Sequence, residues 1–379
     1  MSNQIFQTLK ELPTPLVESQ CVLHKHELLI CGGYQQRACY SYHTIKNEYK
    51  LICEYPGDVE LIGHCVVKLV DNNKDINQIT LLHTLMMEYV SVWSENEMNK
   101  SKKLNKFNKS NNYNEWVPFT DNHNHQIQIG NDYDNYIGVR AVISGSNNHL
   151  LFITYQLQNI SVFDLNTFQF IKHDNLPIDN HIYYHCFVSN PENGQVQEMI
   201  KTNEKKNKRN YQMLLFCFKT GLSIEYDEDN NTFQFHQIPV CKDIAPFYAY
   251  AYVCINDIIL FFGGYGNRTC SKFVHKYSIR ENKWMIFQNT LPSPLCNFVA
   301  ILSEEDNHIY IIGGEDDKKI ISLTHIKTKV REWDPSQLVI ICLFSKNEIK
   351  FNIAHWIRTL QIEFGWIDDF DKIIMKYIR

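Results

Sequence analysis

Short apolar runs, each bounded by turn residues, recur along the chain. The run at 258–262, IILFF, is too short for a helix and apolar at every position, which is typical of a strand covered on both faces. Gly263 and Gly264 follow, and they predict a sharp turn because glycine accepts positive φ without steric cost. A second strand-like run carries Tyr277, and Trp284 stands seven residues further on. Together these features predict a small antiparallel sheet.

The same arrangement recurs, which indicates internal repeats. Glycine pairs occur at Gly32 and Gly33, Gly263 and Gly264, and Gly313 and Gly314. Residue pairs seven positions apart, mostly aromatic, are Tyr42 and Tyr49, Phe163 and Phe170, Tyr226 and Phe233, Tyr277 and Trp284, and Ile326 and Trp333. We therefore predict six repeats, at 14–55, 56–119, 137–175, 176–237, 238–290 and 291–335. Each should form a four-stranded sheet with its rings stacked against neighbouring sheets.

The second repeat departs from this pattern. It lacks the glycine pair and reaches Tyr89 quickly, and we assign its tyrosine-like position to Trp93 and its closing aromatic position to Trp116. Its second hairpin is therefore expected to be short or irregular.

An apolar strand, a glycine pair, a tyrosine and a tryptophan at this spacing resemble the kelch repeat. The resemblance covers residues 14–335 and is strongest in the fifth and sixth repeats. It implies an all-β fold, a kelch-type β-propeller whose four-stranded sheets are blades around an axis. We expect six blades, with seven as the alternative if residues 338–352 belong to another blade. Such propellers typically close by pairing the two chain ends in one blade, and residues 5–9 are the strand available for that closure.

The domain organisation follows from composition along the chain. Residues 1–345 are assigned to the propeller, with polar, Asn- and Lys-rich insertions at 94–115 and 190–210 that are expected to lie outside the sheets. From 346 to 379 the apolar residues recur at intervals of three and four, which predicts helix. Gly365 separates two such runs, so a short C-terminal helical hairpin is expected.

Composition narrows the functional classes. The chain of 379 residues carries a net charge of -5, which argues against nucleic-acid binding because that requires a basic surface. No signal-peptide pattern and no apolar run of membrane-spanning length occurs, so no membrane association is expected. Twelve cysteines are scattered without a CxxC pair, as expected for core thiols in a reducing compartment. These features predict a cytoplasmic protein.

Few residues suggest catalytic or metal chemistry. Asp121, His123 and His125 could form a metal cluster, and His181 and His185 would share one face of a strand, but ordinary loop and core histidines are the favoured interpretation of both groups. We therefore predict no metal, no cofactor and no catalytic residue. The kelch resemblance includes copper radical oxidases and sialic-acid mutarotases, so a propeller enzyme of the galactose oxidase or mutarotase type is the alternative.

The favoured function is a non-catalytic scaffold that binds another protein. The turns after the glycine pairs are expected on one face together with the connections between blades, and binding residues belong on such loops. Tyr34, Arg37, Tyr265 and Arg268 are the candidate contacts, because aromatic residues and arginine dominate interface hot spots. Ordinary turn residues are the simpler interpretation of each one. The resemblance implies a ubiquitin-ligase component or a cytoskeletal protein as the partner.

Overall fold

The computed structural model describes residues 5–69, 76–81, 84–93, 113–130, 134–190 and 210–334. The chain divides into two compact units, Met1–Lys329 and Val330–Arg379. The predicted helical hairpin, the boundary at 345/346 and almost all of the two predicted insertions lie outside the described residues. The described part of the second unit begins with a short 3-10 helix, η1 (Val330–Glu332). Within the described residues, no helix has both the length and the apolar character needed to cross a lipid bilayer.

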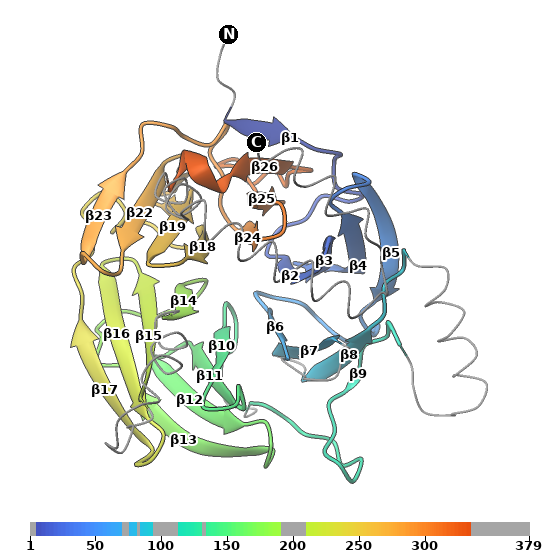
Figure 1. The fold of residues 1–379 in the computed structure, drawn as a ribbon, viewed down its shortest axis with the longest axis vertical. Helices are drawn as coiled ribbons and strands as arrows, with labels where there is room; N and C mark the ends of the chain where they lie inside the picture. Colours follow the sequence, from blue (N-terminus) through green and yellow to red (C-terminus); the bar gives the residue numbers. More distant parts are fainter. Residues whose placement is uncertain are drawn as a thin grey trace, which may run out of the picture. The chain divides into compact units, whose positions relative to one another are not determined.

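The described residues of the first unit form six four-stranded antiparallel sheets, of which three come from the N-terminal half of the chain (Figure 1). The first sheet comprises β2 (Gln20–His24), β3 (Glu27–Gly33), β4 (Gln36–His43) and β5 (Glu48–Glu54). The second comprises β6 (Cys65–Lys68), β7 (Ile76–Leu81), β8 (Leu85–Tyr89) and β9 (Val117–Pro118). The third comprises β10 (Arg140–Ser144), β11 (Leu150–Tyr155), β12 (Asn159–Asp164) and β13 (Gln169–Asn175).

The other three sheets take most of their strands from the C-terminal half. The fourth comprises β14 (Cys186–Ser189), β15 (Asn210–Cys217), β16 (Thr220–Asp227) and β17 (Thr232–Gln237). The fifth comprises β18 (Ala251–Ile255), β19 (Ile258–Phe262), β22 (Val274–Ser278) and β23 (Lys283–Ile286), with a small hairpin of β20 (Tyr265–Gly266) and β21 (Thr269–Cys270) between its second and third strands. The sixth comprises β24 (Val299–Ser303), β25 (His308–Ile312), β26 (His325–Lys329) and β1 (Phe6–Thr8). The first five predicted repeats therefore each contain the four strands of one sheet, and the sixth contains three strands of the last sheet, whose fourth strand is β1.

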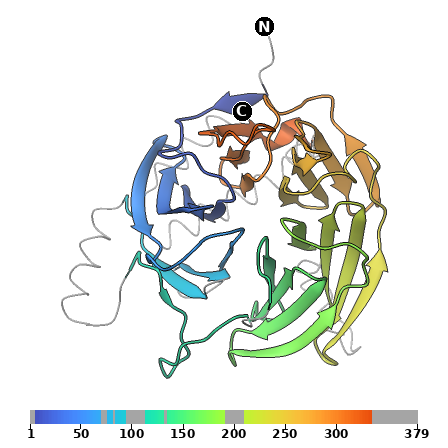
Figure 2. The same ribbon diagram turned by 180° about the vertical axis from the view of Figure 1, so that it is seen from behind.

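The sheets follow one another around an axis, with the first strand of each nearest the centre (Figures 1 and 2). These inner strands contact one another in a closed order, β2, β6, β10, β14, β18, β24 and back to β2. The last sheet takes its outer strand from the N-terminus, since Phe6, Gln7 and Thr8 of β1 pair with Thr328, Lys327 and Ile326 of β26. The predicted β-propeller class and the predicted closing strand are both confirmed.

Neighbouring sheets bury apolar residues between them. Every residue of β19 is buried, because this strand is flanked by β18 and β22 within its sheet and covered on both faces. The same holds for β11 in the third sheet. Apolar clusters lie between the first and second, second and third, third and fourth, fourth and fifth, and sixth and first sheets. The core is thus distributed around the axis.

The seven-residue aromatic interval corresponds to a cross-strand pair between the third and fourth strands of a sheet. The pairs in register are Tyr42 with Tyr49, Phe163 with Phe170, Tyr226 with Phe233, and Tyr277 with Trp284, with ring centroids 4.9, 5.2, 4.9 and 5.1 Å apart. The first member of each pair is at most 2% exposed. These rings are therefore core residues of the sheets.

The tyrosines of these pairs share a second contact that fixes the following turn. The hydroxyl groups of Tyr42, Tyr226 and Tyr277 each donate a hydrogen bond of 2.8 Å to the side-chain oxygen of an asparagine five residues later, Asn47, Asn231 and Asn282. Each asparagine has φ near +54°, a conformation that asparagine tolerates better than most residues. The third sheet has Phe163, which lacks a hydroxyl, and correspondingly Phe168 in place of the asparagine.

Two aromatic positions were assigned wrongly from the sequence. Trp333 was expected on the fourth strand of the last sheet, but it follows η1 and is buried outside any strand, because β1 takes the place of that strand. Trp93 lies in a turn after β8, and Tyr89 is the buried aromatic residue of the third strand in the second sheet. Trp116 directly precedes β9 and stacks on Tyr55 at 4.6 Å.

The glycine pairs allow the chain entering one sheet to lie against the sheet before it. Gly263 and Gly313 have φ of +60° and +70°, and a Cβ atom on them would lie 2.4 Å from the Leu295 carbonyl oxygen and 2.5 Å from that of Leu16. The neighbouring N–H groups of Gly264 and Gly314 donate to those same carbonyl oxygens, at 2.9 and 2.8 Å. Glycine is therefore required by backbone approach between sheets.

Replacing Tyr277 with alanine tests the packing between sheets. Tyr277 packs 4.9 Å from Phe216 of the fourth sheet, so Tyr277→Ala should lower the free energy of unfolding by about 3 kcal/mol or more through the cavity it leaves. Denaturant unfolding followed by circular dichroism measures this. Met285→Ala, at a side chain 45% exposed on the same sheet, is the control and should change stability by no more than about 0.5 kcal/mol. Equal effects of the two substitutions would contradict the packing.

Candidate functional site

The strand order places two kinds of connection on one face of the propeller. Because the strands alternate in direction, the second-to-third connections within sheets and the connections between successive sheets emerge together, and the remaining hairpin turns emerge on the opposite face. We call the first of these the ring face. It carries all four residues predicted to contact a partner.

Six residues on the ring face surround the axis at equivalent positions. Each stands two residues before the first strand of its sheet: Glu18, Gly63, Gly138, Tyr184, Ala249 and Asn297. All six have positive φ, between +49° and +71°. Four of them are not glycine, and such residues persist at positive φ only where the surrounding structure holds them there. We call this set the central ring.

Hydrogen bonds join the central ring into a cycle. Five links run from a backbone N–H to the carbonyl oxygen of the ring residue of the preceding sheet, at distances of 2.8–3.2 Å: Glu18 to Asn297, Asn297 to Ala249, Ala249 to Tyr184, Tyr184 to Gly138, and Gly138 to Gly63. The sixth link differs, because the Gly63 N–H donates to the Glu18 carboxylate, at 2.9 Å. A side chain thus completes the cycle at the junction of the first and second sheets.

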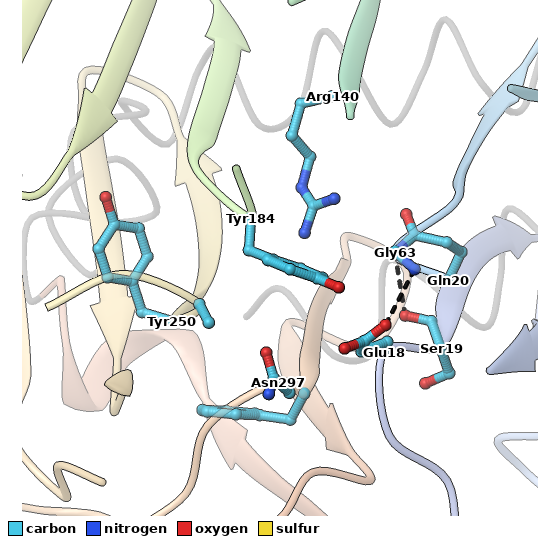
Figure 3. A pocket seen from close by; sticks show the side chains of 10 residues that line it. Glu18, Ser19, Gln20, Gly63, Arg140, Tyr184, Tyr250 and Asn297 are labelled. Atoms are coloured by element: carbon cyan, nitrogen blue, oxygen red, sulfur yellow. Dashed lines mark hydrogen bonds between the residues drawn. The ribbon is translucent and has the colours of Figure 1, made fainter. Parts of the chain in front are cut away.

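Glu18 belongs to a polar group of side chains at this junction (Figure 3). The Tyr184 side chain interacts with its carboxylate and acts to lower the pKa of Glu18. The Arg140 guanidinium lies over the Tyr184 ring, 5.9 Å from the ring centroid, and its Nη1 donates to the Val139 carbonyl oxygen at 2.8 Å. Asn297 lines the same cavity and donates through Nδ2 to Glu315 at 2.9 Å. The site therefore combines a carboxylate, a phenol and a guanidinium.

Burial dominates the electrostatics of this group. It raises the pKa of Glu18, although the hydrogen bonds from Tyr184 and Gly63 and the charge of Arg140 act in the opposite direction. Burial also raises the pKa of Tyr184 above its ordinary range, and the neighbouring Glu18 charge adds to the effect. Tyr184 consequently stays a hydrogen-bond donor at physiological pH. His185, next in sequence, is fully buried, and burial lowers its pKa well below the ordinary value.

The cavity beside Glu18 is small. The space open to water measures about 20 Å³, which is room for a water molecule, whereas small-molecule sites usually measure about 300–1,000 Å³. The Glu18 carboxylate, the Tyr184 phenol and the Arg140 guanidinium can hold a water molecule there and stabilise the central ring. The volume is too small for a sugar-sized substrate.

A larger groove lies beside two of the predicted contact residues. Tyr34 is in the turn between β3 and β4 and is 39% exposed, and Arg37 is an exposed residue of β4. The groove has a volume of about 250 Å³ and is lined by residues 35–37 and by residues 57–61 of the connection to the second sheet. Arg37 lies 3.9 Å from Glu54, a weak surface ion pair that leaves the guanidinium accessible.

The other two predicted contact residues lie on the small hairpin of the fifth sheet. Tyr265 is on β20 and packs edge-on against Tyr248 at 5.8 Å, with its N–H donating to the Tyr248 carbonyl oxygen at 2.7 Å. Arg268 is exposed in the turn between β20 and β21, at φ +63°. The structure therefore brings together Tyr34 with Arg37 and, separately, Tyr265 with Arg268, with the sixth sheet between the two pairs.

The candidate metal histidines differ in their placement. His123 and His125 lie close to the Asp121 carboxylate, whose pKa is held below its ordinary value chiefly by hydrogen bonds from the His125 and His123 backbone N–H groups. His181 and His185 were predicted on a strand, but both precede β14, with His181 exposed and His185 buried. His185 Nε2 instead forms a hydrogen bond of 2.6 Å with the Thr154 hydroxyl.

The sequence prediction missed Glu18, Arg140 and Tyr184. They lie outside the strand–glycine–tyrosine–tryptophan pattern, and their residue types differ from one repeat to the next at the same position. The one available signal was their fixed place two residues before a first strand, or at its start in the case of Arg140. That signal requires strand bounds more precise than apolar periodicity provides.

Comparison with known proteins supports the architecture. No protein-family model matches the chain, and no curated protein matches it in sequence. Among solved structures the chain is similar to one titled "Structure of YjhT", with a TM-score of 0.55 and 12% sequence identity over 83% of this chain and 95% of that chain. At this identity the likeness shows the fold alone. The chain is thus an all-β propeller protein.

Replacing Glu18 with glutamine tests the electrostatics of the central ring. A glutamine side chain would keep an oxygen for the Gly63 N–H but carry no charge. Because the folded-state pKa of Glu18 is raised, its contribution to stability is fully present below the ordinary value of 4.5 and is lost as the pH rises through the raised value. Glu18→Gln should therefore become more stable relative to the unsubstituted protein as the pH rises from 4.5 to neutrality.

Thermal melting of both proteins across this range measures the effect. A difference in Tm that is independent of pH, or that falls as the pH rises, would contradict the assignment of a buried, destabilised carboxylate.

Proposed function

We propose that the protein is a non-catalytic interaction module, a six-bladed kelch-type propeller that binds another protein through its ring face. The observation that carries this proposal is an arc of exposed apolar side chains. Of the nine large apolar side chains that are exposed among the described residues, five stand in second-to-third connections: Leu157 in the third sheet and, in three further sheets, Phe273, Ile320, Ile321 and Tyr34.

These three sheets, the fifth, sixth and first, are consecutive around the axis. The predicted contact residues therefore lie at the two ends of the arc, with Tyr265 and Arg268 in the fifth sheet, and Arg37 beside Tyr34, itself a member of the arc, in the first sheet. Exposed apolar side chains bordered by arginine are typical of protein-binding surfaces. The groove beside Arg37 gives a partner side chain a place to insert.

The partner would be a cytoplasmic protein. The absence of CxxC pairs among the scattered cysteines favours a reducing compartment, and the net charge of -5 disfavours nucleic acid. The kelch resemblance favours a ubiquitin-ligase component or a cytoskeletal protein.

A propeller enzyme is the second candidate function. The observation that favours it is the convergence of Glu18, Tyr184 and Arg140 beside the axis, since a carboxylate of raised pKa with a phenol and a guanidinium could serve acid–base chemistry. The cavity of about 20 Å³ beside them leaves no room for a substrate larger than water, which favours the interaction module.

Removing both flanking arginines tests the proposed binding face. Arg37→Ala combined with Arg268→Ala should weaken partner binding by at least about tenfold, the size expected for loss of interface hot spots, while Tm stays nearly unchanged because both side chains are exposed. Affinity capture from the source cell, followed by titration of the captured protein, measures both quantities.

Arg280→Ala is the matched control. Arg280 is equally a surface arginine, with a side chain 74% exposed, but it lies in the turn between β22 and β23 on the opposite face. Equal capture by the double variant and by Arg280→Ala would reject the ring face as the binding surface.

A further inference from the structure

The connection between β9 and β10 contains a short, well-tied loop at 119–127. Thr120 pairs with Gln126 as an antiparallel bridge, and the Ile127 N–H donates to the Phe119 carbonyl oxygen at 2.8 Å. Phe119 is 4% exposed and anchors the base of the loop in the core between the second and third sheets. The connection itself runs outward beyond the sheets (Figure 1). The loop is therefore fixed at its base and open at its tip.

Asp121 organises the tip of this loop through both carboxylate oxygens. Oδ1 accepts hydrogen bonds of 2.8 Å from the backbone N–H groups of His123 and His125. The Asp121 N–H in turn donates to the His125 carbonyl oxygen at 2.9 Å. Oδ2 faces the two imidazole rings, 3.0 Å from Nδ1 of His125 and 4.0 Å from Nδ1 of His123. Three possible metal-ligand atoms, Asp121 Oδ2 and the Nδ1 atoms of His123 and His125, thus lie on one side of the tip.

We propose that Asp121 Oδ2, His123 Nδ1 and His125 Nδ1 form a binding site for a divalent transition-metal ion of the Zn²⁺ type. Bonds of about 2.0–2.2 Å around such an ion place neighbouring ligand atoms roughly 3.0–3.5 Å apart. One possible ligand atom from each of the three residues lies within 4.8 Å of the others, and the distances from Oδ2 to the two Nδ1 atoms, 3.0 and 4.0 Å, bracket the required separation. Because the His123 side chain is largely exposed, its ring has room to turn toward Oδ2.

The donor set selects the class of metal. Two imidazole nitrogens and one carboxylate oxygen suit Zn²⁺ and its transition-metal neighbours, whereas Ca²⁺ and Mg²⁺ require shells made mostly of oxygen. The side chains of His123 and His125 are 80% and 78% exposed, so the remaining coordination positions are open to water or to a donor from another molecule. The present contact between His125 and Asp121 would be exchanged for the two metal bonds.

The sequence alone favoured ordinary loop histidines because no contact that orients Asp121 is visible in the sequence. The structure shows this support in the two backbone N–H groups that hold its carboxylate. This inference does not depend on the proposed partner binding, and its test uses no partner.

Calorimetric titration of Zn²⁺ into the full-length, chelator-treated protein tests the site. The double variant His123→Ala with His125→Ala should bind one ion fewer than the unsubstituted protein, and each single substitution should weaken that ion by at least about tenfold. His236→Ala removes an exposed histidine from β17 and should bind as the unsubstituted protein does. Zn²⁺ bound elsewhere, for example by the thiols, contributes equally to the unsubstituted protein and to each variant, so it does not affect the difference between them.

The His123 and His125 side chains are largely exposed, so replacing them should not disturb folding. Unchanged melting curves of the histidine variants would verify this. Asp121→Asn is a further variant, which keeps an oxygen for the backbone N–H groups while removing the charge, and it should also weaken Zn²⁺ binding. If the double histidine variant binds Zn²⁺ with the same stoichiometry and affinity as the unsubstituted protein, the three side chains form only a hydrogen-bonded loop and the proposal is wrong.

Discussion

The burial of both faces of each sheet between two neighbouring sheets is the constraint on which this structure depends. A four-stranded sheet with an apolar second strand such as β11 or β19 cannot expose either face to water. A row of such sheets would leave two uncovered faces at its ends, and closing the row into a circle removes them. The closure here depends on β1, which pairs with β26 and lets the sixth sheet pack on the first, where Tyr42 meets Tyr310.

The closed circle also explains the division between rigid and accessible parts. Near the axis the chain is fixed by the cycle of hydrogen bonds through the central ring, completed by the carboxylate of Glu18. The cavity beside Glu18 admits about one water molecule, whereas a larger groove lies among the loops further out. The ring-face loops carry the exposed apolar residues and arginines, and the Asp121 loop is held at its base by the buried Phe119. The rigid centre thus fixes the positions from which these surface loops extend.

Sequence periodicity was sufficient to predict the propeller architecture. The aromatic residues seven positions apart pair across neighbouring strands, so their spacing reveals how those strands are aligned. The interval from Tyr277 to Trp284 is the length of one tight turn between paired strands, and it recurs wherever that turn recurs. The asparagine five residues after Tyr42, Tyr226 and Tyr277 was a further signal visible in the sequence. The interval failed at Ile326 and Trp333 because a strand from the far end of the chain occupies the place of the fourth strand.

The candidate sites were less predictable because they depend on contacts between distant segments. Glu18, Arg140 and Tyr184 come from three different sheets and meet only when the circle closes. The spacing of His123 and His125 was evident, but the hydrogen bonds that turn the Asp121 carboxylate toward both rings follow from the loop conformation. Tyr34, Arg37, Tyr265 and Arg268 lie in or beside second-to-third connections on one face, a placement that strand alternation alone determines.

Native-state hydrogen exchange of the second-strand amides tests the closed circle most directly. If every sheet depends on both neighbours, amides in the middle of β3, β11, β15, β19 and β25 open together, with one shared free energy equal to that of global unfolding. Opening of β25 and the sixth sheet at a much lower free energy, with the other sheets still protected, would show that closure by β1 is dispensable and would contradict the account.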